Sequence, residues 1–144
     1  MNAVESPIAD WLAGLKNEKV RYRVRRYFER FIWFWREEQH DASLPVDYEA
    51  LTRIMLSLRF KHLTSPDANI RFVVDGVATR WFNDMIKEGS TLSRNTAETA
   101  LGYVMGFFKY HRCRLQPQVQ FKRERSRRKH VPTLKELAQI IPLM

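Results

Sequence analysis

Lysine and arginine side chains concentrate in three stretches of this sequence, and phosphate binding is the chemistry that they could perform. The guanidinium fork of arginine matches the oxygens of a phosphate group, and lysine adds a compact positive charge. The first stretch holds six cations in twelve residues: Lys19, Arg21, Arg23, Arg25, Arg26 and Arg30. A solvated helix face could have the same composition. We favour a phosphate-facing surface, because cations this close together repel one another without a counter-charge.

The second group of candidate residues belongs to a helix predicted near residues 93–110. Arg94, Asn95 and Thr96 stand at its beginning, where free backbone N–H groups can also hold a phosphate. Lys109 and Arg112 follow at its far end. We therefore expect cations at both ends of this helix.

The third stretch is a basic tract at residues 121–130, which contains a single acid. A core cannot absorb so many charges, so the tract is interpreted as a linker, a tail or a strip laid on phosphates. The three stretches together give the candidate phosphate-binding residues, which are Arg21, Arg23, Arg25, Arg26, Arg94, Asn95, Thr96, Lys109, Arg112, Lys122, Arg123, Arg125, Arg127 and Arg128. We expect these cations to form one continuous surface.

The overall charge of the chain points to a polyanionic partner. The formal net charge is +9 and the sequence pI is about 10.1. Nucleic acid is favoured over an anionic membrane surface, while a basic protein that merely stays soluble is the alternative. Charge alone does not separate DNA from RNA, because both release counterions on binding.

The sequence offers few groups for catalysis or metal binding. Gly-rich phosphate loops, nucleophile elbows and His-Glu-x-x-His motifs are absent from it. The four histidines are scattered, and a solvent-exposed role is expected for each, so neither a metal nor a cofactor is predicted. A single cysteine, Cys113, excludes an intrachain disulfide. The longest apolar run, residues 31–35, is too short to cross a bilayer, and no signal peptide is apparent, so a cytoplasmic location is expected.

Hydrophobic periodicity predicts an all-α fold, a small bundle of four to five helices. The helices are expected at residues 8–15, 18–38, 47–60, 67–89 and 93–110. Ser6, Asp47 and either Ser93 or Asn95 are expected to cap helices, and Ser65-Pro66 is expected to open the fourth. The core face of the fourth helix is predicted as Ile70, Val73, Val74, Val77, Trp81 and Met85, with Gly89 as a left-handed cap. A further short helix is expected from Thr133, where a capping box stands.

Several segments in this order resemble a known family. The run Leu-Ser-Arg-Asn-Thr at residues 92–96, followed by Leu101 and by Phe-Phe-Lys-Tyr at 107–110, resembles the closing helix of the core-binding domain of tyrosine recombinases (phage-type integrases). The long helix, the Ser-Pro-Asp start at residues 65–67 and the basic linker into Val-Pro-Thr-Leu-Lys-Glu-Leu at 131–137 are similar to that family as well. The resemblance implies a SAM-like core-binding domain at residues 1–116, a linker at 117–132 and the start of a catalytic domain at 133–144.

The family implies a function for this chain. It would clamp duplex DNA at a recombination site, next to other recombinase protomers, and it would be nucleoid-associated when bound. His111-Arg112-Cys113-Arg114 spells the family's His-x-x-Arg, but no tyrosine follows Tyr110 to serve as nucleophile. We therefore expect this chain not to cleave DNA. The alternative is a helical protein–protein interaction module that uses part of Trp33, Phe34 and Trp35 as an exposed patch.

Overall fold

A computed structural model of the chain describes residues 6–87, 89–90 and 92–119. Within these ranges the chain forms six α-helices and no strand, which confirms the predicted all-α bundle. The helices are α1 (Pro7–Leu12), α2 (Glu18–Gln39), α3 (Tyr48–Leu63), α4 (Ala68–Arg71), α5 (Val73–Ile86) and α6 (Arg94–Tyr110). The helix expected from Thr133 lies outside the described residues. No helix in the described part of the chain is long and apolar enough to span a membrane.

Short polar side chains fix where the helices begin. The side chains of Ser6, Asp47 and Ser93 accept backbone N–H bonds from the first turns of α1, α3 and α6, which confirms those three caps. Asn17 was expected near the end of the first helix but caps α2, so α1 stops earlier, at Leu12. The cap of α4 is Asp67, and Ser65 instead accepts a hydrogen bond from the Asp67 N–H.

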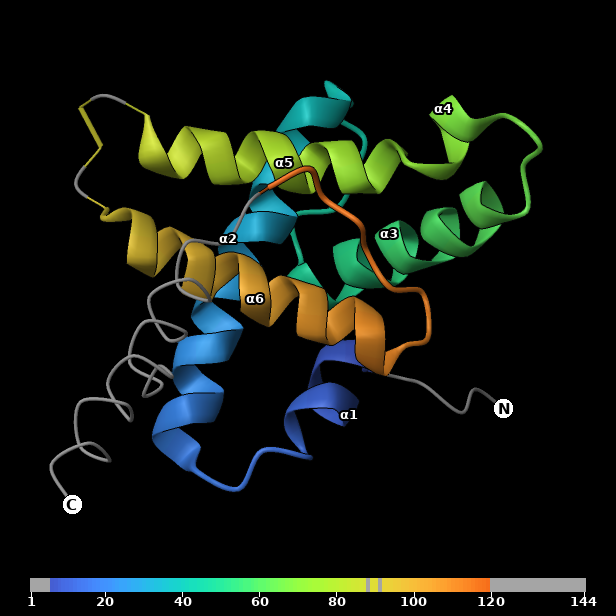
Figure 1. The fold of residues 1–144 in the computed structure, drawn as a ribbon. Coiled ribbons are helices and arrows are strands. Elements are labelled where there is room, and N and C mark those ends of the chain that lie inside the picture. The colour runs from blue at the N-terminus through green and yellow to red at the C-terminus, as the bar shows by residue number, and fades with distance from the viewer. Residues whose placement is uncertain (1–5, 88, 91, 120–144) are drawn as a thin grey trace, which may run out of the picture.

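Helix α6 lies at the centre of the bundle, between α5 on one side and α2 and α1 on the other (Figure 1). Ala97, Leu101, Val104 and Phe108 recur at steps of four, three and four, which predicts one side of a helix, and all four are fully buried. Aromatic rings fill the contact with α2, where the centroids of Phe28 and Phe107 are 4.3 Å apart. Helix α6 is therefore held by the core on its inner sides, and its two ends reach the surface.

The predicted fourth helix is broken into α4 and α5 at Phe72, whose backbone leaves the helical region. A cause is visible in the preceding residue, because the carbonyl oxygen of Arg71 accepts a hydrogen bond from the buried Arg59 side chain. The break turns Ile70 and Val73 outward, so their prediction as core residues was wrong. Gly89 does have a left-handed backbone with φ of 88°, but it lies beyond the helix end at Ile86.

The aromatic run of α2 forms no large exposed patch. Trp35 is buried, and Phe34 is half-buried against the core. Trp33 is more exposed, but its ring is covered in part by the guanidinium of Arg36, 5.1 Å away, and by Tyr48. Most of the aromatic surface that the protein–protein alternative would use is therefore covered by contacts within the domain.

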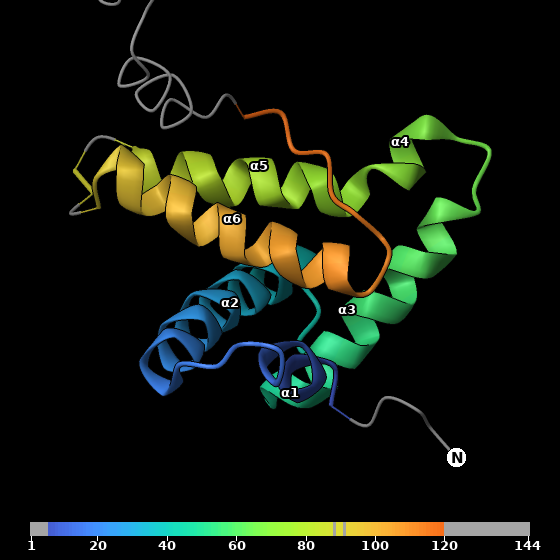
Figure 2. The ribbon, with the colours of Figure 1, turned by 60° about the horizontal axis from the view of Figure 1, so that its bottom comes forward.

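The segment after α6 lies along the outside of the bundle and crosses α5 (Figure 2). We call residues 113–119 the strap. Its first residues, Cys113 and Leu115, are buried, and Val119 packs against the core. Although the strap has no regular secondary structure, it is therefore part of the folded unit.

Candidate nucleic-acid interface

Four cations form a straight row on the outer face of α2. Lys19, Arg23, Arg26 and Arg30 are spaced by four, three and four residues, so they share one side of the helix. The core residues Val24, Phe28, Phe31, Ile32 and Trp35 occupy the opposite side. All four cations are exposed, and none makes an ion pair with a described residue. We call this row the α2 stripe.

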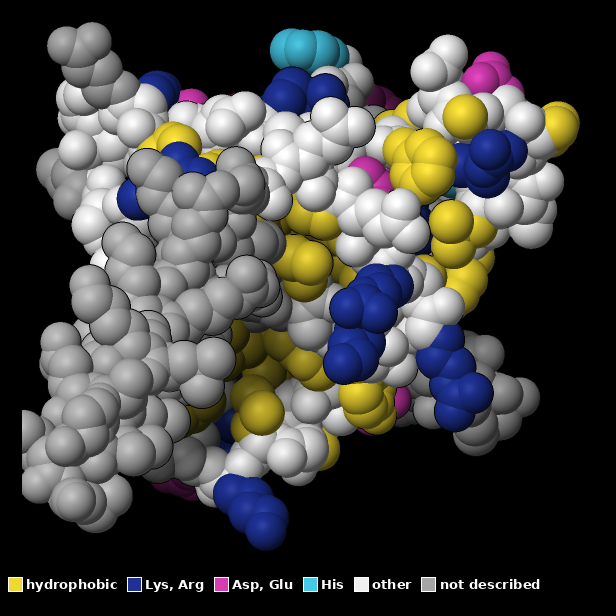
Figure 3. Space-filling view, viewed as in Figure 1, with side chains coloured by type: hydrophobic (Ala, Val, Ile, Leu, Met, Phe, Trp, Pro, Cys, Tyr) yellow, Lys and Arg dark blue, Asp and Glu magenta, His cyan; other side chains and the backbone are white. Residues whose placement is uncertain are grey.

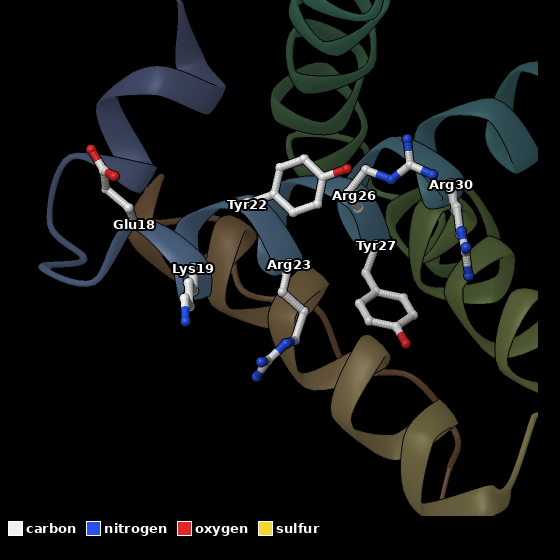
Figure 4. A pocket seen from close by; sticks show the side chains of 7 residues that line it. All are labelled: Glu18, Lys19, Tyr22, Arg23, Arg26, Tyr27 and Arg30. Carbon is white, nitrogen blue, oxygen red and sulfur yellow. The ribbon is translucent and has the colours of Figure 1, made fainter.

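Two tyrosines border the α2 stripe and orient its arginines. The guanidinium carbon of Arg26 lies 6.0 Å from the ring centre of Tyr22, and that of Arg30 lies 5.3 Å from the ring centre of Tyr27. Such cation–π contacts hold a guanidinium without neutralising it. Figure 4 shows these side chains around a shallow hollow on α2, with Glu18 at one end. The hollow therefore presents several positive charges and one negative charge to solvent.

The other two predicted cations of α2, Arg21 and Arg25, have bonding partners within the protein. The Arg21 guanidinium donates a hydrogen bond to the carbonyl oxygen of Leu15, which steadies the α1–α2 turn. Arg25 Nε lies 3.0 Å from Glu29 Oε2 in an i,i+4 ion pair. The structure thus separates the predicted cations of this helix into a stripe that includes Arg23 and Arg26 and a pair with internal partners.

The three residues predicted at the start of α6 differ in their surroundings. Arg94 pairs with Glu98 at 3.1 Å and lies over the ring of Phe82, so its side chain is only one-third exposed, at 33%. Asn95 is exposed, and Thr96 is half-buried beside the Ser93 cap. The carboxylate of Glu98 is fully buried and compensates the Arg94 charge. Arg94 therefore has a structural contact with Phe82 of α5 that its sequence position did not indicate.

Lys109 and Arg112 are both exposed at the far end of α6, about 25 Å along the helix from Arg94. Arg112 has a left-handed backbone with φ of 62° and lines a second surface groove. That groove lies between α1, α3 and the end of α6, and it is lined by Pro7, Arg53, Leu56, Ser57, Phe60, Tyr110, His111 and Arg112. The two ends of α6 thus belong to different surfaces.

The described cations of the predicted set fall into several groups. On the part of the face that Figure 3 draws in colour, lysine and arginine side chains stand in separate spots with apolar and neutral surface between them. The ion pairs of Arg25 and Arg94 and the length of α6 separate these groups, and one continuous cationic surface stays a prediction. Lys122, Arg123, Arg125, Arg127 and Arg128 lie outside the described residues.

A buried ion pair that the sequence analysis missed connects α3, α5 and the strap. The side chains of Arg59 and Asp75 are 1% and 3% exposed and contact each other directly. Arg59 also donates to the carbonyl oxygens of Arg71, at 2.9 Å, and Arg114, at 2.8 Å. One signal was present in the sequence: Leu51, Met55 and Arg59 are spaced by four, which puts the arginine on the core side of its helix.

Two side chains of the His-x-x-Arg segment, His111 and Cys113, lie partly or fully within the folded domain. His111 is half-buried, which differs from its expected exposure, and its Nε2 donates to the carbonyl oxygen of Pro7 at 3.0 Å. Burial lowers the pKa of His111, against the opposing effects of the Pro7 hydrogen bond and the Asp10 charge. Burial also raises the pKa of the Cys113 thiol to about 11. The His111 hydrogen bond thus joins the end of α6 to the start of α1, while Cys113 is buried in the strap.

The lowered pKa of His111 predicts a loss of stability in acid. Below the usual histidine pKa of 6.5, the unfolded chain binds this proton more readily than the folded chain, so the free energy of unfolding falls as pH drops. We expect denaturant titrations between about pH 7.5 and 5 to show a smaller fall for His111→Gln than for wild type. His40→Gln, at an exposed position, is the control and should behave as wild type. An unchanged fall in His111→Gln would contradict the assignment.

The described residues contain no group of three or more histidine, cysteine or acidic side chains that could hold a metal ion. No family model, curated protein or solved structure matches the chain. The α2 stripe is therefore the arrangement from which a function can be argued.

Proposed function

We propose that this chain binds duplex DNA through the α2 stripe, as the DNA-binding domain of a site-specific tyrosine recombinase. The observation that carries the DNA part is the row of four exposed cations without a described carboxylate partner. The recombinase part rests on the resemblance in the order of helices and linker. Other protomers on the same DNA site are the further partners that this proposal implies.

The dimensions of the α2 stripe suit a nucleic-acid backbone. The twelve residues from Lys19 to Arg30 lie on one helix, and its eleven rises between them span about 16 Å. One strand of a duplex presents a phosphate about every 3.4 Å along its axis, so roughly five phosphates lie within that length. Tyr22 and Tyr27 add amphipathic contact area beside the cations. Most of the binding affinity would then come from contacts between the α2 stripe and phosphates. Recognition of a base sequence would need other side chains that reach the base edges.

The test is the salt dependence of duplex binding, measured by fluorescence anisotropy. Replacing Arg23, Arg26 and Arg30 with glutamine should flatten the plot of log K against log salt by about 2.7, because each lost phosphate contact contributes about 0.9. We also expect the affinity of this stripe variant at low salt to fall by at least tenfold.

A matched control removes the same amount of charge elsewhere. Arg25, Arg80 and Lys87 are paired with Glu29, Glu38 and Asp84. Changing these three to glutamine should alter the slope by less than about 1, since cations with internal partners release few counterions. Equal effects of the two triple variants would reject the α2 stripe as the binding surface. Competition with single-stranded RNA distinguishes DNA from RNA as the preferred ligand.

The proposal assigns no strand cleavage to this chain. His111, the one histidine of a His-x-x-Arg segment, already donates its Nε2 proton to the Pro7 carbonyl. Incubation with supercoiled plasmid should therefore leave the plasmid intact, and nicking that survives removal of His111 would show a different catalytic group.

A protein–protein interaction module is the second candidate, and the groove at the end of α6 favours it. Phe60 and Tyr110 line that groove and are 45% and 51% exposed. Deletion of residues 122–129 separates the two candidates. It should weaken duplex binding severely if the chain binds DNA, and it should leave a partner in this groove unaffected.

A further inference from the structure

The strap is attached to the bundle by polar groups at three successive points. Asp75 Oδ2 accepts a hydrogen bond from the backbone N–H of Gln116. Thr79, one turn further along α5, accepts one from the backbone N–H of Gln118 at 3.0 Å. Arg59 donates to the carbonyl oxygens of Cys113, at 3.4 Å, and Arg114. The backbone groups of four strap residues are thus bonded to α3 or α5: Cys113, Arg114, Gln116 and Gln118.

These contacts involve the backbone of the strap, so they fix its path whatever its side chains are. The two side chains that make most of them, Arg59 and Asp75, are buried and paired with each other, which leaves them little freedom to move. Such a buried network is more than packing requires, because apolar side chains could have filled the same space. A role in placing the chain beyond the strap accounts for it.

We propose that Arg59 and Asp75 are positioning residues, which hold the strap on α5 and so fix the point from which the chain leads into the basic tract. The first cation of the tract is Lys122, three residues beyond Val119. Three residues reach at most about 10 Å, so an anchored strap restricts where the first cations of the tract can go. The functional meaning of this restriction rests on the proposed DNA binding.

The strap has a defined place relative to the α2 stripe. It crosses α5, and α6 separates α5 from the first half of α2 in both Figure 1 and Figure 2. The last described residues of the strap and the α2 stripe therefore lie on different sides of α6.

Spin labels test the anchoring without any DNA. Asn83 on α5 and Gln118 on the strap are exposed, so cysteines placed there can be labelled while the buried Cys113 stays unmodified. Continuous-wave electron resonance, which suits labels this close together, should give a narrow distance distribution in the otherwise wild-type chain. Thr79→Val removes the acceptor for Gln118 and should broaden it, and Asp75→Asn should broaden it further. Thr64→Val, whose hydroxyl contacts only its own helix turn, is the control.

Equally broad distributions in the otherwise wild-type chain and Thr79→Val would overturn the anchoring, even if Asp75→Asn fails to fold.

A second experiment, which measures duplex DNA binding, tests whether the anchored strap positions the tract. Thr79→Val should weaken duplex binding about threefold, and this loss should vanish when Lys122, Arg123 and Arg125 are glutamine. A loss that persists in the neutralised chain would overturn the positioning role. If neither the stripe nor the tract affects duplex binding, the proposed function fails, while the label distances still decide the anchoring.

Discussion

Replacing Arg59 with methionine should lower the free energy of unfolding by about 3–5 kcal/mol, a large part of the stability of a small domain. The substitution keeps most of the side-chain volume but leaves the Asp75 carboxylate buried without its cation. It also strips hydrogen-bond donors from the carbonyl oxygens of Arg71 and Arg114. Urea unfolding followed by circular dichroism measures the change.

Lys61→Met is the matched control for this prediction, because it removes an exposed cation two residues further along α3. Its effect should stay within about 0.5 kcal/mol. Arg59→Lys should be intermediate, since an ammonium keeps the charge but lacks the fork that reaches several acceptors at once. A loss below about 1 kcal/mol for Arg59→Met would show that the pair is not the anchor described above.

Phe107→Ala should destabilise the domain to a similar extent, by about 3–5 kcal/mol. The ring of Phe107 is fully buried where α1, α2 and α6 meet, 5.3 Å from the ring of Trp11 and 4.3 Å from that of Phe28. Truncation removes apolar contact area. It also leaves a cavity, which the three surrounding helices can fill only in part by moving closer. Thermal and urea unfolding should both report the loss.

Tyr110→Ala, one turn further along α6, provides the comparison. Tyr110 is half-exposed and contacts the ring of His111 rather than the core, so we expect a loss below about 1 kcal/mol. If the two variants were equally destabilised, the interior described for α6 would be wrong. Because Tyr110 lines the groove at the end of α6, the same variant also tests that groove without unfolding the domain.

Local signals in the sequence were enough to predict most of the helices. The stripe from Ala97 to Phe108 repeats with the period of a helix, and all four of its residues are buried as expected. Ser6 and Ser93 were recognisable as caps, because a short polar residue precedes each apolar repeat. Helix periodicity and N-caps depend only on residues a few positions apart, so both can be recognised in the sequence.

The features that could not be predicted depend on contacts between distant residues. The break at Phe72 follows from a hydrogen bond that Arg59 makes from another helix, and periodicity alone continues through it. In the same way, the guanidinium of Arg94 lies over the ring of Phe82 on another helix, whereas its pairing with Glu98 is a local i,i+4 contact. Which cations of a basic chain remain available for a ligand is therefore decided by tertiary structure.

The buried and exposed faces of α2 differ in what they contribute to the stability of the domain. Val24, Phe28 and Phe31 determine whether the domain folds, whereas Arg23 and Arg26 contribute almost nothing to its interior. Surface substitutions of this kind usually change stability by less than about 0.5 kcal/mol. If the proposed DNA binding holds, its affinity could be changed over a wide range by exchanging residues on the outer face, and the folded state would tolerate each substitution.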